Sequence, residues 1–243
     1  MLTKSEVKYI QSLSQKKFRD QEGIYMAEGP KMVEEALSEG NLIIKRIFAT
    51  ENWATAHKDV GSVTTVAAHE LLKISQLKTP NQVLAILEKP IPSDAVFDKS
   101  GLSLVLDGIQ DPGNLGTIIR TADWFGVKQV VCSPDCADAF ASKVVQSTMG
   151  SIFRIHIFYR ELEEWIQENP DLTFYGAALQ GKPLQQIRGV ASGAVVIGNE
   201  SKGIRDAVMQ HIHEKITIDK KGKAESLNAA VATGIILAHL TTQ

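Results

Sequence analysis

Residues 102–107, with the sequence LSLVLD, form a nearly continuous apolar run that ends in an acidic residue. Such a run is typical of a β-strand covered on both faces, as the strands of parallel sheets are. Strand and helix patterns then alternate, with strands at 128–132 and near 172–178, 194–198 and 214–218, and helices at 115–124 and 226–240. This alternation predicts an α/β fold with a parallel sheet flanked by helices.

The first ninety residues predict a smaller α/β unit. Thr3 and Glu6 have the spacing of a capping box at a helix start, and Pro30 and Gly40 suit the beginning and end of a second helix. Two strands and an intervening helix are expected at 42–49, 83–87 and 67–74. The Pro-containing, aperiodic stretch 88–101 then favours a linker. We therefore expect domains at 1–90 and 102–243, joined by a linker at 91–101.

Composition narrows the function classes. The formal net charge is −2, so any binding to nucleic acid must come from local patches rather than bulk charge. No apolar run approaches the roughly 18–20 residues of a membrane span, and the N-terminus lacks a signal-peptide core. We expect a cytoplasmic protein. Cys132 and Cys136 are its two cysteines, with nothing nearby to complete a zinc site, and no metal is expected.

Three polar or glycine-rich stretches follow predicted strands, where an open parallel sheet binds its ligands; they are 107–126, 195–204 and 218–240. Each alone could be an ordinary turn or helix cap. The first has only Gly113 and Gly116 and lacks the dinucleotide-binding fingerprint. The second is not a Walker A loop, because Ile204 and Arg205 stand where Lys and Ser or Thr are required.

Together, and in this order, the three stretches resemble the signature motifs of the SpoU (TrmH) family of RNA ribose methyltransferases, of the SPOUT class. The matching residues are NLGTIIRTAD at 114–123, GNESKG at 198–203 and ESLN at 225–228. The resemblance covers about 102–241. It extends more weakly to 18–20 and 27–29, where the first unit is similar to a ribosomal-protein-like, substrate RNA-binding domain.

The resemblance implies a C-terminal trefoil knot, which holds S-adenosylmethionine largely by backbone groups. It also implies a homodimer whose active site uses residues of both subunits. The implied cofactor-binding residues are Ala178, Leu179, Gly198, Asn199, Gly203, Ile218, Ser226 and Leu227. In one departure, Asp219 and Lys220 stand where the family usually has Pro and an apolar residue.

The implied reaction is methylation of a ribose 2′-hydroxyl, with Arg120, Asn114, Glu200, Ser226 and Asn228 as catalytic residues. The family's matching arginine is assigned to activating the hydroxyl. Because a free guanidinium stays protonated and is a poor base, we expect Arg120 to grip a phosphate and position the ribose instead. Where the proton goes stays open.

Lysines near the N-terminus are either a solvated helix face or an RNA contact. The expected RNA-binding residues are Lys16, Lys17, Arg19, Glu28 and Arg120. By family analogy, ribosomal RNA is favoured over transfer RNA. Two other hypotheses are a Rossmann-type nucleotide enzyme, disfavoured by the missing glycine fingerprint, and a non-catalytic RNA-binding relative. The second is disfavoured because Asn114, Arg120 and Asn228 are all intact.

Overall fold

The computed structural model describes residues 1–79, 81–90 and 97–241. The chain divides into two compact units, one of Met1–Pro90 with Phe140–Phe153 and one of Ile91–Ala139 with Arg154–Gln243. The sequence analysis placed 140–153 in the second domain, but its contacts group it with the first unit. The Gln146 side-chain amide donates to the carbonyl oxygen of Glu28 at 2.9 Å, and the ring of Phe140 lies 4.9 Å from that of Tyr25.

The predicted linker falls partly outside the described residues, at 91–96. Its described part belongs to the second unit. The Phe97 ring packs edge-on against Trp165, with ring centres 5.1 Å apart. The Asp98 N–H donates to the Gln129 side chain at 2.8 Å, and Gln129 Nε2 donates back to the Asp98 carbonyl at 2.7 Å. Within the predicted linker, Phe97 and the backbone of Asp98 are therefore attached to the second unit, whereas Lys99 and Ser100 are exposed.

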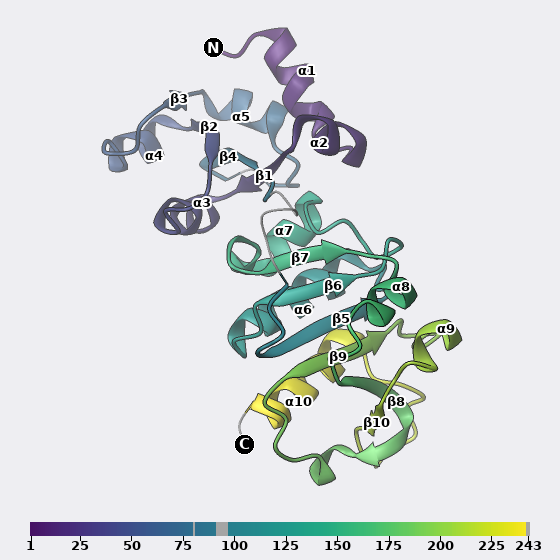
Figure 1. The fold of residues 1–243 in the computed structure, drawn as a ribbon. Coiled ribbons are helices and arrows are strands. Elements are labelled where there is room, and N and C mark those ends of the chain that lie inside the picture. The colour runs from purple at the N-terminus through teal and green to yellow at the C-terminus, as the bar shows by residue number, and fades with distance from the viewer. Residues whose placement is uncertain (80, 91–96, 242–243) are drawn as a thin grey trace. The chain divides into compact units, whose positions relative to one another are not determined.

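The first unit is built on a four-stranded sheet of order β1-β4-β2-β3, with strands Ile24–Glu28, Val83–Glu88, Ile44–Ala49 and Val63–Thr65 (Figure 1). Strand β4 is antiparallel to β1 and β2, whereas β3 is parallel to β2. The helices are α1 (Lys4–Ser12), α2 (Lys16–Glu22), α3 (Pro30–Ser38), α4 (Glu51–Ala56), α5 (Ala68–Ile74), α7 (Ser142–Thr148) and the 3₁₀ turn Ser151–Phe153.

Local sequence explains how these helices begin. The predicted capping box is confirmed: Glu6 donates its N–H to Thr3 Oγ1 at 3.2 Å, and the Thr3 N–H donates to Glu6 Oε2 at 2.9 Å. Pro30 is the first residue of α3, as its fixed φ favours. Apolar residues of α1, α5 and the sheet form one core, including Ile10, Leu13, Phe48, Leu71, Ile74 and Leu84.

The second unit contains a six-stranded, fully parallel sheet of order β10-β8-β9-β5-β6-β7. Its strands are Glu214–Thr217, Phe174–Pro183, Gly193–Gly198, Leu102–Asp107, Gln129–Cys132 and His156–Tyr159. The predicted α/β fold with a parallel sheet is thus confirmed, and β7 is the strand that the sequence analysis missed. Strands β5 and β9 are central and almost completely buried, as their apolar runs indicated.

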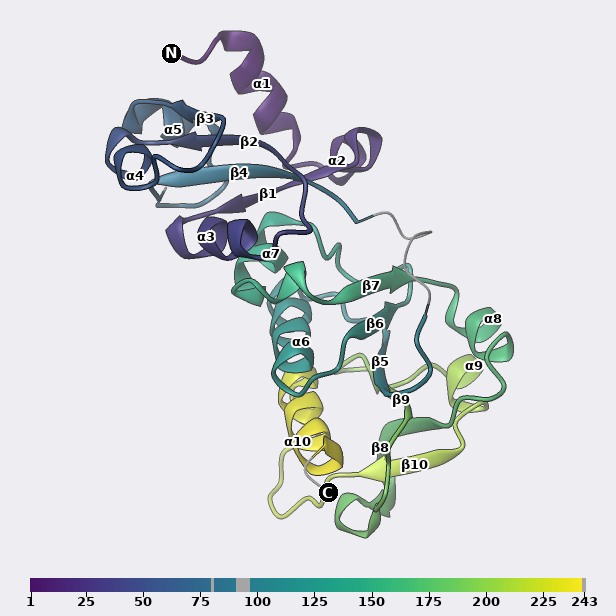
Figure 2. The ribbon, with the colours of Figure 1, turned by 60° about the vertical axis from the view of Figure 1, so that its left-hand side comes forward.

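Helices cover both faces of this sheet. Figure 2 shows α6 (Pro112–Trp124) and α10 (Ala229–Thr241) on one face, with α8 (Leu162–Gln167) and α9 (Asp206–Met209) on the other. A 3₁₀ turn, Leu184–Gln186, follows β8. Beneath α8 and α9 the core includes Val105, Phe158, Trp165, Phe174 and Val196. Within the described residues, no helix combines the length and apolar character needed to cross a membrane.

Candidate active site

Helix α6 places the first predicted site residue. The Asp111 carboxylate caps the helix by accepting the Asn114 N–H at 2.8 Å, and Pro112 occupies the first helical position. The helix therefore begins three residues before the predicted Leu115. This start directs Asn114, in the first turn, toward the loop that follows β9, because their side chains hydrogen bond.

Asn114, Glu200 and Asn228 form one hydrogen-bonded cluster, although they are far apart in sequence. Asn114 Nδ2 donates to Glu200 Oε1 at 2.5 Å, and Asn228 Nδ2 donates to Asn114 Oδ1 at 2.9 Å. Ser226 Oγ lies 3.4 Å from the Glu200 carbonyl oxygen. The structure thus brings together four of the five predicted catalytic residues. One amide, Asn114, fixes both a carboxylate and a second amide.

Asn228 also sets the start of the last helix. Its Oδ1 accepts the N–H groups of Ala230 at 3.0 Å and Val231 at 3.3 Å, which is the role of a helix cap. Helix α10 begins at Ala229, three residues later than predicted, because Ser226 and Leu227 remain in the preceding loop. The same side chain thus joins the last helix to the cluster.

The turn after β9 is a closed backbone structure. The Asn199 and Gly203 backbones exchange hydrogen bonds of 3.1 and 2.8 Å, and Gly203 has a φ of +69°. A Cβ atom on Gly198 would overlap the backbone of Gly203 and Ile204. Asn199 Nδ2 donates to the Gly108 carbonyl at 2.9 Å. Only glycine therefore fits at 198, and the turn that carries Glu200 is fixed to the loop after β5.

An ion pair between a buried carboxylate and an exposed arginine, not singled out from the sequence, follows this turn directly. The Asp107 carboxylate is fully buried and accepts Arg205 N–H at 2.7 Å and Nε at 2.6 Å, with Arg205 Nη2 at 2.5 Å. Hydrogen bonding to Asp107 raises the pKa of Arg205. Arg205 also lies 3.6 Å from Asp135, whose pKa is lowered by the Ser133 hydroxyl. The acidic residue that ends the LSLVLD run, Asp107, was the sequence feature that could have indicated this ion pair.

The predicted cofactor residues lie in the middle of β8, at the carboxyl ends of β9 and β10, and in the loops after β9 and β10. Thr217 Oγ1 donates to the Leu179 carbonyl at 3.2 Å. Ala178 and Ile218 are half-buried. The Leu179 side chain is 77% exposed and that of Leu227 46% exposed. Two large, solvent-facing apolar side chains at this edge are suited to an aromatic ring such as adenine.

Arg120 does not join the cluster. It lies six residues after Asn114 on α6, which is roughly 120° around the helix axis at about 100° per residue. Its side chain is exposed and makes no hydrogen bond or ion pair with the described residues. Within one chain, the guanidinium is thus free to meet a ligand.

The predicted RNA-binding residues of the first unit separate into two pairs. Lys16 and Lys17 are exposed. Arg19 is buried and donates from Nη1 to the carbonyls of Leu13 and Ser14 at 2.7 and 2.8 Å. Glu28 is buried as well. This geometry argues against direct RNA contacts by Arg19 and Glu28, because both side chains are used inside the unit.

Glu28 has a structural role at the end of β1. Its carboxylate accepts the Ser75 hydroxyl at 2.5 Å and the Gln76 N–H at 2.9 Å. Burial raises the pKa of the Glu28 carboxyl above its ordinary value. The hydrogen bonds tie the loop after α5 to the sheet.

The two cysteines are buried thiols at the end of β6. Cys136 Sγ accepts the Ile109 N–H at 3.2 Å. A hydrogen bond from Cys132 lowers the pKa of Cys136 to about 7, and the same contact raises the pKa of Cys132. No group of three or more His, Cys, Asp or Glu side chains is arranged to hold a metal ion in the described ranges.

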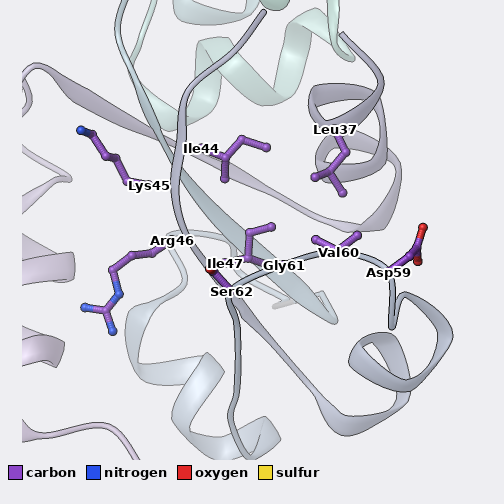
Figure 3. Close-up of a pocket in the computed structure, with 9 residues that line it drawn as sticks. All are labelled: Leu37, Ile44, Lys45, Arg46, Ile47, Asp59, Val60, Gly61 and Ser62. Atoms are coloured by element: carbon purple, nitrogen blue, oxygen red, sulfur yellow. The ribbon is translucent and has the colours of Figure 1, made fainter. Parts of the chain in front are cut away.

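A shallow pocket of about 370 Å³ lies in the first unit, between α3, β2 and the 59–62 loop (Figure 3). Leu37, Ile44 and Val60 face the hollow, whereas Lys45 and Arg46 extend away from it. These two cations are paired with Glu88 and Glu6. None of the predicted site residues lines this pocket.

Comparison with known proteins identifies two families along the chain. Residues 101–238 match the SpoU rRNA Methylase family, and residues 4–85 match the MRM3-like substrate binding domain. The 23S rRNA (guanosine(2553)-2'-O)-methyltransferase RlmP of Bacillus subtilis (strain 168) is 34% identical over 97% of this chain and 95% of its own length.

Solved structures agree in fold. The AdoMet-bound rRNA methyltransferase from Sinorhizobium meliloti superimposes with a TM-score of 0.87 at 32% identity, covering 98% of this chain and 95% of that one. The SpoU methyltransferase AviRb from Streptomyces viridochromogenes has a TM-score of 0.86 over 98% of this chain and 97% of its own. At 22% identity, AviRb supports the fold alone.

Proposed function

The chain belongs to the SpoU rRNA Methylase family, and from this membership we propose that it methylates a ribose 2′-hydroxyl of RNA with S-adenosylmethionine. The observation that carries the proposal is the relative that matches almost the whole chain, a ribosomal RNA 2′-O-methyltransferase. The protein is an RNA methyltransferase, and ribosomal RNA is its favoured substrate.

The residues present fit the cofactor. Exposed Leu179 and Leu227 offer apolar surface for adenine, and the closed turn at 198–203, which Ser226 contacts, offers backbone groups. A related rRNA methyltransferase was crystallised with AdoMet bound. S-adenosylmethionine supplies an electrophilic methyl group on a sulfonium centre. Ala178, Asn199 and Ile218 complete the set that we propose to line its site.

The chain's own residues then position the hydroxyl. In methyl transfer, a carbon–oxygen bond forms while the carbon–sulfur bond breaks, and the hydroxyl proton leaves, so the oxygen must be held in line. We propose that Asn114, Glu200 and Asn228 fix this geometry, since their hydrogen bonds lock three separate segments together. Arg120 grips a neighbouring phosphate with its planar fork, because a guanidinium offers two parallel N–H donors to an oxyanion.

The first unit delivers the substrate. Its match to a substrate binding domain supports this role, and exposed Lys16 and Lys17 remain its candidate RNA contacts. The side chains of Arg19 and Glu28 instead stabilise the unit through hydrogen bonds in its interior. We propose the domain roles as RNA binding for 1–90 and catalysis for 102–243, in a cytoplasmic protein.

We also propose a homodimer and a C-terminal trefoil knot. The dimer is supported by apolar side chains that face solvent on α6 and α10: Trp124 is 84% exposed, Val231 51% and Ile235 40%. Val231 and Ile235 are four residues apart and share one helix face. The knot is supported by the fold similarity and by the Ser226–Glu200 contact between two loops. Light scattering at the mass of one 26.6 kDa chain would contradict the dimer.

The experiment is a methyl-transfer assay with radiolabelled S-adenosylmethionine, using 23S ribosomal RNA and bulk transfer RNA in parallel. Label should enter ribosomal RNA and persist after alkaline hydrolysis as an uncleaved dinucleotide, because a 2′-O-methyl group blocks attack on the adjacent phosphate. Label in transfer RNA alone would favour the alternative substrate. Absence of transfer to either RNA, with cofactor bound, would favour a non-catalytic RNA-binding protein.

A further inference from the structure

The loop between β10 and α10 is exposed throughout, yet it is held at both ends. Every residue from 219 to 228 is exposed and none lies in a helix or strand. At one end the Thr217 hydroxyl bonds to the Leu179 carbonyl, and at the other Asn228 bonds to Asn114. Ser226 contacts the turn that carries Glu200. The loop therefore borders the candidate site without being buried by it.

Unpaired cations of the second unit are concentrated on this loop and its neighbours. Six Lys and Arg residues of that unit make ion pairs or side-chain hydrogen bonds, namely Lys99, Arg154, Arg160, Lys182, Arg188 and Arg205. In the described part of the unit, seven make neither: Arg120, Lys128, Lys202, Lys215, Lys220, Lys221 and Lys223. Five of these seven stand on the three motif stretches, and only Lys128 and Lys215 lie elsewhere.

The loop has a positive charge in a chain whose overall charge is −2, because it carries three lysines against Asp219 and Glu225. Lys202 adds a further cation from the adjoining turn, which also carries Glu200 and lies near the Asp135 carboxylate. An ammonium group left unpaired beside an RNA methylation site is suited to phosphate, which it binds as a point charge.

We propose that Lys202, Lys220, Lys221 and Lys223 bind backbone phosphates of the RNA strand that flanks the target nucleotide. This surface, the lysine loop, rests on the proposed function, because it assigns RNA as the ligand beside the catalytic cluster. Sequence-specific RNA recognition mostly targets splayed, single-stranded segments, whose phosphates are accessible on both sides, and we take the target ribose to lie in such a segment. The lysine loop holds that segment without reading its sequence.

The test compares a variant that removes three charges, Lys220→Gln/Lys221→Gln/Lys223→Gln, with a control that removes two charges elsewhere in the unit, Lys128→Gln/Lys215→Gln. The control removes two unpaired lysines of the same unit that are outside the motif stretches. The probe is a fluorescein-labelled oligouridylate of about 20 nucleotides, titrated by anisotropy between about 50 and 200 mM KCl. Removing one phosphate contact to a single strand makes the slope of log affinity against log salt shallower by about 0.7.

We expect the loop variant to make the slope shallower by about 2 and to weaken the low-salt affinity tenfold or more, with the control unchanged. Its affinity for S-adenosylmethionine, measured by calorimetry, should stay within about twofold of the wild-type value, since the cofactor is held by other groups. An unchanged slope, an equal effect in the control, or an equal weakening of cofactor binding would each overturn the proposal. A wild-type protein that binds the probe but methylates no RNA would instead refute the proposed function.

Discussion

Exchanging the polar groups of Asn114 and Glu200 tests whether their hydrogen bond organises the site. Asn114→Asp replaces the amide donor, 2.5 Å from Glu200 Oε1, with a second carboxylate. The loss of a hydrogen bond to a charged group costs about 1.5–3 kcal/mol. Two carboxylates about 4 Å apart add up to about 4 kcal/mol of repulsion at an effective dielectric constant of about 20. Both side chains are half-buried, so solvent screening reduces the repulsion.

We therefore expect Asn114→Asp to lower the free energy of unfolding by about 2 kcal/mol and kcat/KM by about 30-fold. Adding Glu200→Gln restores the hydrogen bond in the opposite direction: the amide at position 200 donates and the carboxylate at position 114 accepts. The double variant should recover about 1.5 kcal/mol of stability relative to Asn114→Asp. Glu200→Gln alone is the control, because the Asn114 amide can still donate to its carbonyl oxygen.

The assays are urea unfolding and single-turnover methylation of the four proteins under one set of conditions. The double-mutant cycle isolates the pairwise energy from the cost of each substitution. If the double variant is no more stable than Asn114→Asp, the two side chains are not coupled and the cluster does not act as a unit.

Three further outcomes follow. Arg120→Ala should leave the affinity for S-adenosylmethionine unchanged by calorimetry but slow single-turnover methylation by about 10²-fold, with little rescue by Arg120→Lys; a wild-type rate would remove its assigned role. Gly198→Ala should weaken cofactor binding by tenfold or more, because its Cβ overlaps backbone, whereas Gly222→Ala, with nothing within 4 Å, should not. The pKa of Glu28 is raised in the folded state, so the protonated carboxyl stabilises the fold. This contribution is fully present below the unfolded pKa of about 4.3, and it is lost as the pH rises through the folded pKa. The unfolding free energy of wild type minus that of Glu28→Gln should therefore fall with rising pH in urea titrations, and a constant difference would contradict the burial argument.

The sequence predicted the parallel sheet well, because buried parallel strands leave continuous apolar runs. Strands β5, β6 and β9 lie within one residue of their predicted bounds. Strand β7 was missed because its sequence, HIFY, is only four residues long and begins with an exposed His156, so its apolar run is short. The sequence did not indicate that 140–153 contacts the first unit, because no local pattern records that Gln146 and Phe140 pack on β1.

At the site, motif spacing indicated Asn114, Glu200, Ser226 and Asn228, and the fold brings them together. The sequence did not predict which of these side chains hydrogen bond to each other, because the bonds join residues that are 86 and 114 positions apart. Asp107 and Arg205 were not singled out as a pair for the same reason. Arg19 and Glu28 looked like surface charges in sequence, but their partners are backbone groups and a hydroxyl inside the first unit.

The position of Asn228 has a consequence for biosynthesis. A nascent chain that has emerged only as far as β9 can already pair the central strands of the sheet, yet Asn114 and Glu200 still lack their third partner. Docking of α10 completes the cluster last, since it begins with the residue that both caps it and bonds to Asn114. We therefore expect a ribosome-bound chain that lacks residues 226–240 to pair these strands without assembling the Asn114–Glu200–Asn228 cluster. A chain that ends before α10 should then be inactive even where its remaining strands pair.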